Sequence, residues 1–164
     1  MQKKYSINFL ITVALVFFIG SFNLQAQQCN SELEVYKGRN ARSATLNDAT
    51  KFKMELTNNS SQSQTYEIQS VIFEDPCEEA GLSGSTNSRN TTGLDVSIQI
   101  NNARASSITV PARSTKSFVA EVSVSSASKF QVWKCVELTA VSNACAKGEA
   151  KALLKVFISD PTNN

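Results

Sequence analysis

The sequence predicts an exported, all-β protein whose single domain is a sandwich of seven or eight antiparallel strands held by two disulfides. Three observations lead to this fold class. The chain begins with the parts of a secretory signal peptide, apolar and polar residues alternate with a period of two along most of the remainder, and the cysteines are four in number.

Residues 1–26 have the composition of a cleavable signal peptide. Lys3 and Lys4 supply the positive start, residues 7–19 (INFLITVALVFFI) form the apolar region, and Ala26 offers a small residue to the peptidase. We expect cleavage after Ala26, which leaves residues 27–164 as one β-sandwich domain. The destination is then the periplasm, the cell surface or the medium.

Two other interpretations of this segment remain open. A transmembrane anchor needs about 20 consecutive apolar residues, and this run is shorter and ends in a cleavable sequence. Lipoprotein processing at Cys29 requires a small residue directly before the cysteine, and Gln28 is not small. We therefore expect no membrane span after signal cleavage.

The charge of the expected mature domain is balanced. The whole chain has 16 basic and 14 acidic residues, and loss of Lys3 and Lys4 leaves 14 of each. A neutral domain gives no electrostatic reason to expect nucleic acid or an anionic membrane as a partner.

Alternation with a period of two marks the strands in order. In KFKMELT at 51–57, for example, Phe52, Met54 and Leu56 share one face while charged residues occupy the other. No stretch after the signal shows a helical period, so we expect little or no helix. The expected strands are 33–36, 51–57, 66–72, 94–100, 108–110, 118–124, 130–141 and 152–158.

A long polar connection interrupts this rhythm at 74–93 (EDPCEEAGLSGSTNSRNTTG), and its length exceeds that of most loops in compact domains. Four carboxylates in it could serve a hard cation such as calcium. Their spacing matches no defined calcium motif, so a solvated loop is the simpler interpretation and we expect no metal site. The weak calcium candidates are Glu74, Asp75, Glu78 and Glu79.

The four cysteines indicate two disulfides in an exported chain, with three possible pairings. Zinc is the competing use of four cysteines. Their positions at Cys29, Cys77, Cys135 and Cys145 include no close C-x-x-C pair, and the chain has no histidine, which argues against a zinc site.

Four stretches resemble a known class of module. They are residues 51–70 (KFKMELTNNSSQSQTYEIQS), residues 108–124 (ITVPARSTKSFVAEVSV) and residues 132–145 (VWKCVELTAVSNAC) with the closing 153–162 (LLKVFISDPT). They are similar to the fibronectin-III-like or immunoglobulin-like modules of Bacteroidota secreted and surface proteins. The resemblance implies an immunoglobulin/fibronectin-III-like sandwich and supports no catalytic residue.

The topology of such a sandwich favours one disulfide pairing. The start of the first strand and the loop between the last two strands lie at one end of the domain, which favours Cys29 with Cys145. The loop after the strand at 66–72 and the start of the strand at 130–141 favour Cys77 with Cys135. The rival bridge, Cys135 with Cys145, would join residues that an extended strand places up to about 30 Å apart.

The absence of histidine limits the chemistry that the chain could perform. Serine–histidine–acid triads, cysteine–histidine pairs and histidine-based metal sites are excluded. A two-carboxylate glycosidase remains formally possible, but Glu55, Glu67 and Glu121 fall on the polar faces of alternating strands. We expect no enzymatic activity and no cofactor.

Two aromatic residues are candidates for core packing. Trp133 is the single tryptophan, and in sandwiches it is expected in the core or as a lid over a disulfide more often than as a ligand contact. The alternation places Trp133 and Cys135 on the face opposite Val136 and Leu138, with Lys134 interrupting the apolar side. Tyr66 is expected in the core.

The function expected from these observations is a non-catalytic interaction or structural module of the adhesion type, with an unknown protein or glycan as its partner. A carbohydrate-binding module is the alternative, and it would expose two or three aromatic residues on one face, whereas the connection at 74–93 contains none. An inhibitor of secreted enzymes is a third possibility.

Overall fold

The computed structural model describes residues 30–74, 93–126, 128–142, 144 and 149–162. In these ranges it contains ten strands and one 3-10 turn, η1 (Tyr36–Gly38), and no α-helix. The strands are β1 (Ser31–Val35), β2 (Ala41–Ala44), β3 (Thr50–Asn58), β4 (Gln64–Glu74), β5 (Leu94–Ile100), β6 (Ala103–Arg104), β7 (Ser107–Val110), β8 (Ser114–Val124), β9 (Val132–Ser142) and β10 (Glu149–Ile158).

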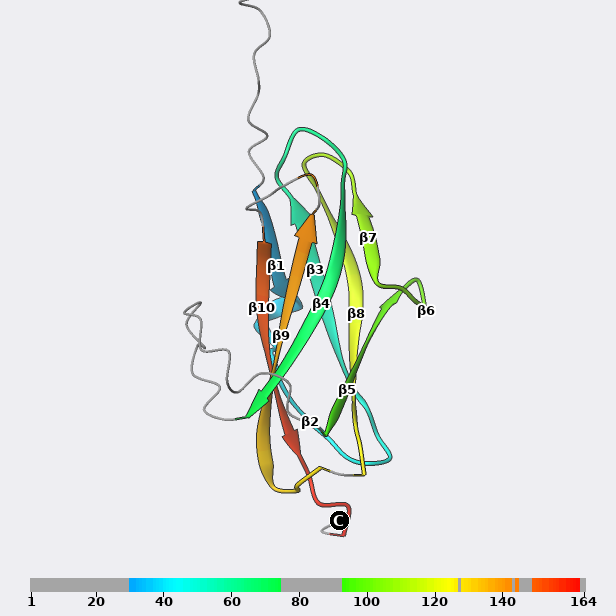
Figure 1. Ribbon diagram of the computed structural model, residues 1–164, viewed down its shortest axis with the longest axis vertical. Coiled ribbons are helices and arrows are strands. Elements are labelled where there is room, and N and C mark those ends of the chain that lie inside the picture. The colour runs from blue at the N-terminus through cyan, green and yellow to red at the C-terminus, as the bar shows by residue number, and fades with distance from the viewer. Residues whose placement is uncertain (1–29, 75–92, 127, 143, 145–148, 163–164) are drawn as a thin grey trace, which may run out of the picture.

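The strands form two sheets packed face to face (Figure 1). Sheet 1 has the order β1-β3-β8-β5-β6, and sheet 2 has the order β2-β10-β9-β4-β7. If β1, β3, β4, β5, β8, β9 and β10 are named strands A to G, these orders contain A-B-E-D and G-F-C. That arrangement is the strand order of an immunoglobulin-like sandwich.

The prediction of an all-β sandwich is confirmed, but the expected strand number is wrong. Ten strands are present instead of seven or eight, because β2 and β6 were not anticipated. In β2, Ala41–Ala44, three of the four residues are exposed, so the sequence ARSA has no alternation to reveal a strand. The expectation of purely antiparallel pairing is also wrong, since β2 runs parallel to β10.

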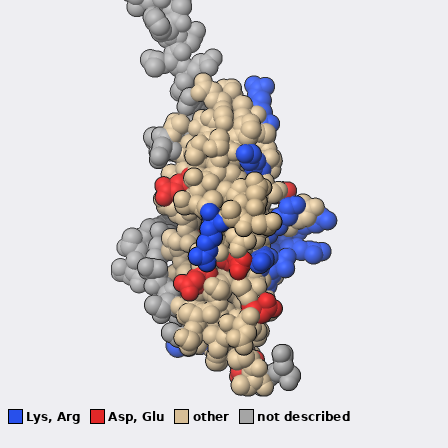
Figure 2. Space-filling view, turned by 90° about the vertical axis from the view of Figure 1, so that its right-hand side faces the viewer, with Lys and Arg blue, Asp and Glu red and all other residues tan. Residues whose placement is uncertain are grey.

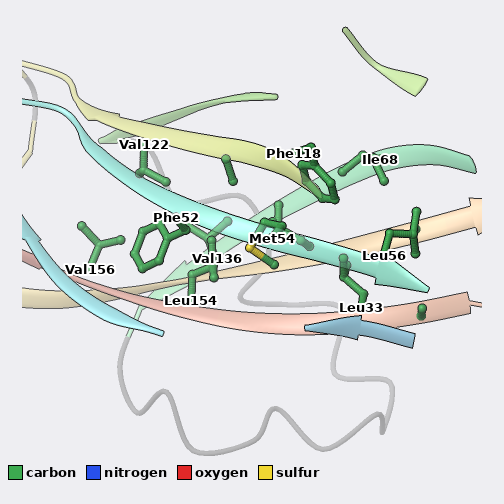
Figure 3. Close-up of a cluster of buried hydrophobic side chains, with 14 of the residues drawn as sticks. Leu33, Phe52, Met54, Leu56, Ile68, Phe118, Val122, Val136, Leu154 and Val156 are labelled. Atoms are coloured by element: carbon green, nitrogen blue, oxygen red, sulfur yellow. The ribbon is translucent and has the colours of Figure 1, made fainter. Parts of the chain in front are cut away.

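The core lies between the two sheets and follows the predicted alternation. Phe52, Met54 and Leu56 of β3 are fully buried and face Val136 and Leu154 of sheet 2 (Figure 3). Tyr66 is 2% exposed, which confirms its predicted place in the core.

Candidate functional site

The outer face of sheet 2 carries an exposed aromatic side chain, that of Trp133. In β9, Val136, Leu138 and Ala140 point into the core, so the residues that alternate with them point away from it. Trp133 is on this outer side and is 40% exposed. The expectation that Trp133 packs in the core is therefore wrong, because its position in the alternation directs its ring outward. Its alternative place as a lid over a disulfide stays a prediction, because Cys29, Cys77 and Cys145 lie outside the described residues.

A second aromatic residue lies directly opposite Trp133. The register of β9 and β10 pairs Trp133 with Phe157, and the centroids of their rings are 5.3 Å apart at an interplanar angle of 52°. This tilted contact falls within the range that aromatic pairs prefer. Phe157 therefore supports the indole ring from the side and leaves part of it open to solvent.

Apolar side chains continue this surface across the sheet. The register pairs Phe73 of β4 with Cys135 of β9, and Leu153 of β10 packs against these two residues. Phe73 is 7% exposed and Cys135 is fully buried, although both lie on the outer side. Phe73, Trp133, Cys135, Leu153 and Phe157 are together called the Trp133 surface below.

Lys134 lies between the two outward residues and takes the inward side of β9. Its side chain is almost completely buried, with 4% of the residue exposed. A Cβ atom added at Gly93 would lie 3.2 Å from the Lys134 Nζ, so the ammonium group reaches the start of β5 rather than the centre of the core. The interruption predicted at Lys134 is thus accommodated by the length of the side chain.

The cysteines are described only in part. Cys135 is not a free thiol in the structure. Cys29, Cys77 and Cys145 lie outside the described residues. The proposed pairing therefore stays a prediction.

Three of the four calcium candidates fall outside the part of the chain that the structure describes. Asp75, Glu78 and Glu79 lie outside the described residues, and Glu74 is described only as the last residue of β4. Within the described ranges, no group of three or more histidine, cysteine, aspartate or glutamate side chains could hold a metal ion.

The strand carboxylates occupy the outer faces, as the alternation predicts. Glu121 of β8 lies 3.4 Å from the Nζ of Lys51 on sheet 1, and Glu67 is exposed on β4. Figure 2 shows basic and acidic side chains together on one side of the molecule, with most of the basic ones gathered toward one edge. These charges belong to the solvated faces of the sheets.

A further exposed aromatic residue, Tyr36, lies away from the Trp133 surface. It is 37% exposed and belongs to η1, which contacts β3 of sheet 1. The Nζ atoms of Lys53 and Lys37 are 4.1 Å and 5.1 Å from the centroid of its ring, which is the geometry of cation–π contacts. Because Lys53 points outward from sheet 1, Tyr36 and Trp133 do not share one aromatic platform.

A notch opens where the chain passes from sheet 1 to sheet 2. Its volume is about 370 Å³, and it lies between the end of β1 and the middle of β10. Sequence reasoning missed it, because it depends on the unpredicted crossing of the chain from β1 to β2. Its lining includes Leu33, Glu34, Val35, Asn40, Ala152 and Leu153.

Comparisons with known proteins find likeness only among solved structures. The chain is similar to the periplasmic chaperone SfaE, with 10% identity and a TM-score of 0.45 over 80% of this chain and 57% of that one. It is similar to a FixG-related protein from Vibrio parahaemolyticus, with 7% identity and a TM-score of 0.47 over 69% and 80% of the two chains. It is also similar to PapD-like domain 7 of human CEP192, with 8% identity and a TM-score of 0.45 over 80% of this chain and 85% of that one.

These likenesses are limited in extent. This chain spans little more than half the length of SfaE. No family model matches the chain, and no curated protein matches it. Among the described residues, no helix is long and apolar enough to cross a membrane.

Proposed function

We propose that this chain is an exported, non-catalytic interaction module of the adhesion type that contacts a protein partner through the Trp133 surface. The observation that supports this proposal is the exposed indole of Trp133, which is stacked on Phe157 and bordered by further apolar side chains. Trp133 and Tyr36 are the two large hydrophobic residues exposed within the described ranges. Aromatic residues held rigidly at a surface are typical centres of protein–protein contacts.

The finer parts of this proposal come from the sequence. The signal peptide at 1–26 favours a location beyond the inner membrane, and the stretches quoted above favour a module of the kind found in Bacteroidota surface proteins. Two disulfides, Cys29 with Cys145 and Cys77 with Cys135, would suit a domain in an oxidising compartment. Protein contact through a sheet face needs no cofactor and no catalytic group.

Carbohydrate binding is the second candidate, and the pairing of Trp133 with Phe157 is the observation that favours it. A sugar ring can stack on an exposed indole. Phe157, however, is half-buried, and Tyr36 lies by sheet 1, so a wide aromatic platform does not form. A protein partner fits the small aromatic anchor better.

A photo-crosslinking experiment tests the proposal. A benzophenone amino acid replaces Trp133 in cells that make the protein, and a matched variant carries it at Ser117, an exposed residue of sheet 1. We expect crosslinks to a polypeptide from position 133 and none from position 117. Equal crosslinking from both positions would contradict a role for the Trp133 surface.

The fluorescence of the wild-type chain tests the sugar alternative. Because Trp133 is the only tryptophan, its emission reports on this surface alone. A saturable emission shift with defined neutral glucan or mannan oligosaccharides, together with no polypeptide crosslink, would replace the proposal by carbohydrate binding.

A further inference from the structure

The side chain of Lys155 lies on the outer side of sheet 2. Its neighbours in β10, Leu154 and Val156, are fully buried and point into the core (Figure 3). Because side chains alternate along a strand, Lys155 points away from the core. The residue is half-buried, so the aliphatic part of the side chain can pack on the sheet while the ammonium group stays in water.

Lys155 occupies the middle of the Trp133 surface. The register of β9 and β10 places it directly opposite Cys135, and Trp133 is its diagonal neighbour, at a distance of about 7–8 Å. On β10 itself, Leu153 and Phe157 lie two residues to either side of it, at roughly 7 Å. A partner that covers both Trp133 and Leu153 therefore also covers Lys155.

No carboxylate of the described residues forms an ion pair with Lys155. Glu137 is its other diagonal neighbour on β9, but the Oε1 of Glu137 lies 3.3 Å from the Nζ of Lys151. Glu149 also pairs with Lys151, at 3.7 Å. Lys151 thus has two carboxylate partners, whereas Lys155 has none in the ranges that the structure describes.

Two further charged residues lie near this part of β10, and both are basic. Arg42 of β2 directs its guanidinium group to the other side of the sheet, 5.7 Å from the centroid of the buried ring of Phe52. Arg39 is exposed and precedes Asn40, whose carbonyl accepts a hydrogen bond from the Lys155 amide. Neither arginine supplies a negative charge to Lys155.

A partner bound to the Trp133 surface would remove water from Lys155. A stable interface buries about 800 Å² of each partner, which is far more than one indole ring, so the side chains around Trp133 are covered with it. An ammonium group that loses its water without gaining an opposite charge opposes binding. A carboxylate on the partner offsets this cost and favours that partner over others.

We infer that the partner presents a side-chain carboxylate to Lys155, with apolar side chains on either side of it that contact the rest of the Trp133 surface. This inference rests on the proposed function, because it names the chemistry of the segment that this surface binds. In an extended segment, residues two apart share a side at a spacing of roughly 7 Å. The pattern apolar-x-acid-x-apolar therefore matches Leu153, Lys155 and Phe157 along β10.

The fluorescence of Trp133 tests this inference on the full chain with its disulfides intact. The probes are the peptide acetyl-Leu-Ser-Asp-Ser-Leu-amide and two analogues that carry asparagine or lysine in place of the aspartate. We expect the aspartate peptide to bind about fivefold more tightly than the asparagine peptide, which is the upper range for an exposed ion pair. The lysine peptide should bind more weakly than both. Equal dissociation constants for the aspartate and asparagine peptides would overturn the inference.

Variants show whether Lys155 is the group that recognises the carboxylate. Lys155→Gln should remove the preference for aspartate over asparagine, and Lys155→Arg should keep it. Lys116→Gln is the matched control, because it makes the same change of charge at an exposed residue of sheet 1, and it should keep the fivefold preference. A preference that persists in Lys155→Gln would mean that the carboxylate binds elsewhere, and the inference would be wrong.

Crosslinking in cells decides the question if none of the peptides binds. With the benzophenone amino acid at position 133, Lys155→Glu should lower the yield of crosslinked polypeptide at least about fivefold, whereas Lys155→Arg should leave it unchanged. A yield that Lys155→Glu does not lower would overturn this inference and leave the proposed function standing. Absence of any polypeptide crosslink from position 133 would instead contradict the proposed function, and this inference with it.

Uronic acids of glycans also carry carboxylates, and the same fluorescence measurement separates them from an acidic peptide. We expect no emission shift with trigalacturonate, because its carboxylates are not flanked by apolar side chains. A saturable shift with trigalacturonate and none with the aspartate peptide would overturn the inference in favour of an acidic glycan.

Discussion

Trp133 and Phe157 face each other across β9 and β10, and the contact between their rings is made on the solvent side of the sandwich. An aromatic pair of this geometry contributes about 0.5–1.5 kcal/mol beyond the burial of its area. That contribution is small beside the core, where Phe52 and Leu154 are fully buried. The pair therefore orients the indole more than it stabilises the fold.

Replacing Trp133 and the core residue Phe52 one at a time should show how differently the two side chains contribute to stability. We expect Trp133→Ala to lower the free energy of unfolding by about 1 kcal/mol, because the side chain is 40% exposed and loses chiefly the contact with Phe157. Phe52→Ala should lower it by about 3–5 kcal/mol, because it leaves a cavity in the core. Urea unfolding followed by circular dichroism measures both, and equal losses would show that Trp133 supports the fold as a core residue does.

Buried polar groups surround Asn58 at the end of β3, and they lead to a second prediction. Asn58 is fully buried, and its Nδ2 faces the carbonyl oxygens of Gln62 (2.8 Å), Val110 and Pro111 (3.1 Å each). Its Oδ1 accepts hydrogen bonds from the amide and hydroxyl of Ser60. Asn58→Asp would place an anion among three carbonyl oxygens, and we expect a loss of about 3 kcal/mol or more of the free energy of unfolding.

The neighbouring residue supplies the control for this substitution. Asn59 donates from its Nδ2 to the Oε1 of Glu32 in an exposed contact, so Asn59→Asp should change the free energy of unfolding by less than about 1 kcal/mol. Thermal and urea unfolding at pH 7 measure both variants. A small effect of Asn58→Asp would mean that the corner can open to water without disturbing β7.

The sandwich could be predicted because its strands are half-buried and their alternation is regular. Phe52, Met54 and Leu56 show this in β3, where each polar neighbour points to solvent. The strand β2 could not be predicted in this way. Ala41–Ala44 lies at the edge of sheet 2 with three exposed residues, and its partner β10 is more than a hundred residues away in sequence.

The sequence could predict on which side of β9 the site residues lie, but not how exposed their side chains are. The alternation of β9 placed Trp133 and Cys135 on the outer side, and the structure has them there. The same alternation cannot say what covers that side, and the two residues differ, one being 40% exposed and the other fully buried. The notch depends on where the chain changes sheets, which no local signal in the sequence encodes.

The pH dependence of stability should reflect Tyr66. Burial raises the pKa of its hydroxyl above the ordinary value of 10.0, against a smaller lowering from a hydrogen bond with Ser31. The folded chain then holds this proton more tightly than the unfolded chain does. The stability that Tyr66 contributes is fully present below pH 10 and is lost as the pH rises through the higher pKa of the folded state.

Urea unfolding between pH 8 and pH 11 measures this effect against Tyr66→Phe. We expect the wild-type chain to lose stability more steeply above pH 10 than the variant, which has no hydroxyl to ionise at this position. Parallel curves for the two proteins would show that ionisation of Tyr66 does not oppose folding.

The disulfide pairing is the last prediction, and β4 and β9 supply its geometric basis. Phe73 lies opposite Cys135, and Cys77 follows Phe73 by four residues after β4 ends at Glu74. A chain that turns back over the outer face of sheet 2 can bring Cys77 to Cys135 within the 4.4–6.8 Å or so between Cα atoms that a disulfide needs. The first strand and the β9–β10 connection then leave Cys29 for Cys145.

Peptide mapping of the non-reduced protein tests this pairing directly. We expect two linked peptides, one joining Cys29 with Cys145 and the other Cys77 with Cys135, and recovery of a peptide that joins Cys135 with Cys145 would overturn the assignment. The double variant Cys77→Ala/Cys135→Ala should lose about 2–4 kcal/mol of the free energy of unfolding, because the bridge restricts the unfolded chain. Since Trp133 and Cys135 share the outer side of β9, the same variant should also change the emission of the single tryptophan, which a pairing of Cys77 with a distant cysteine would not require.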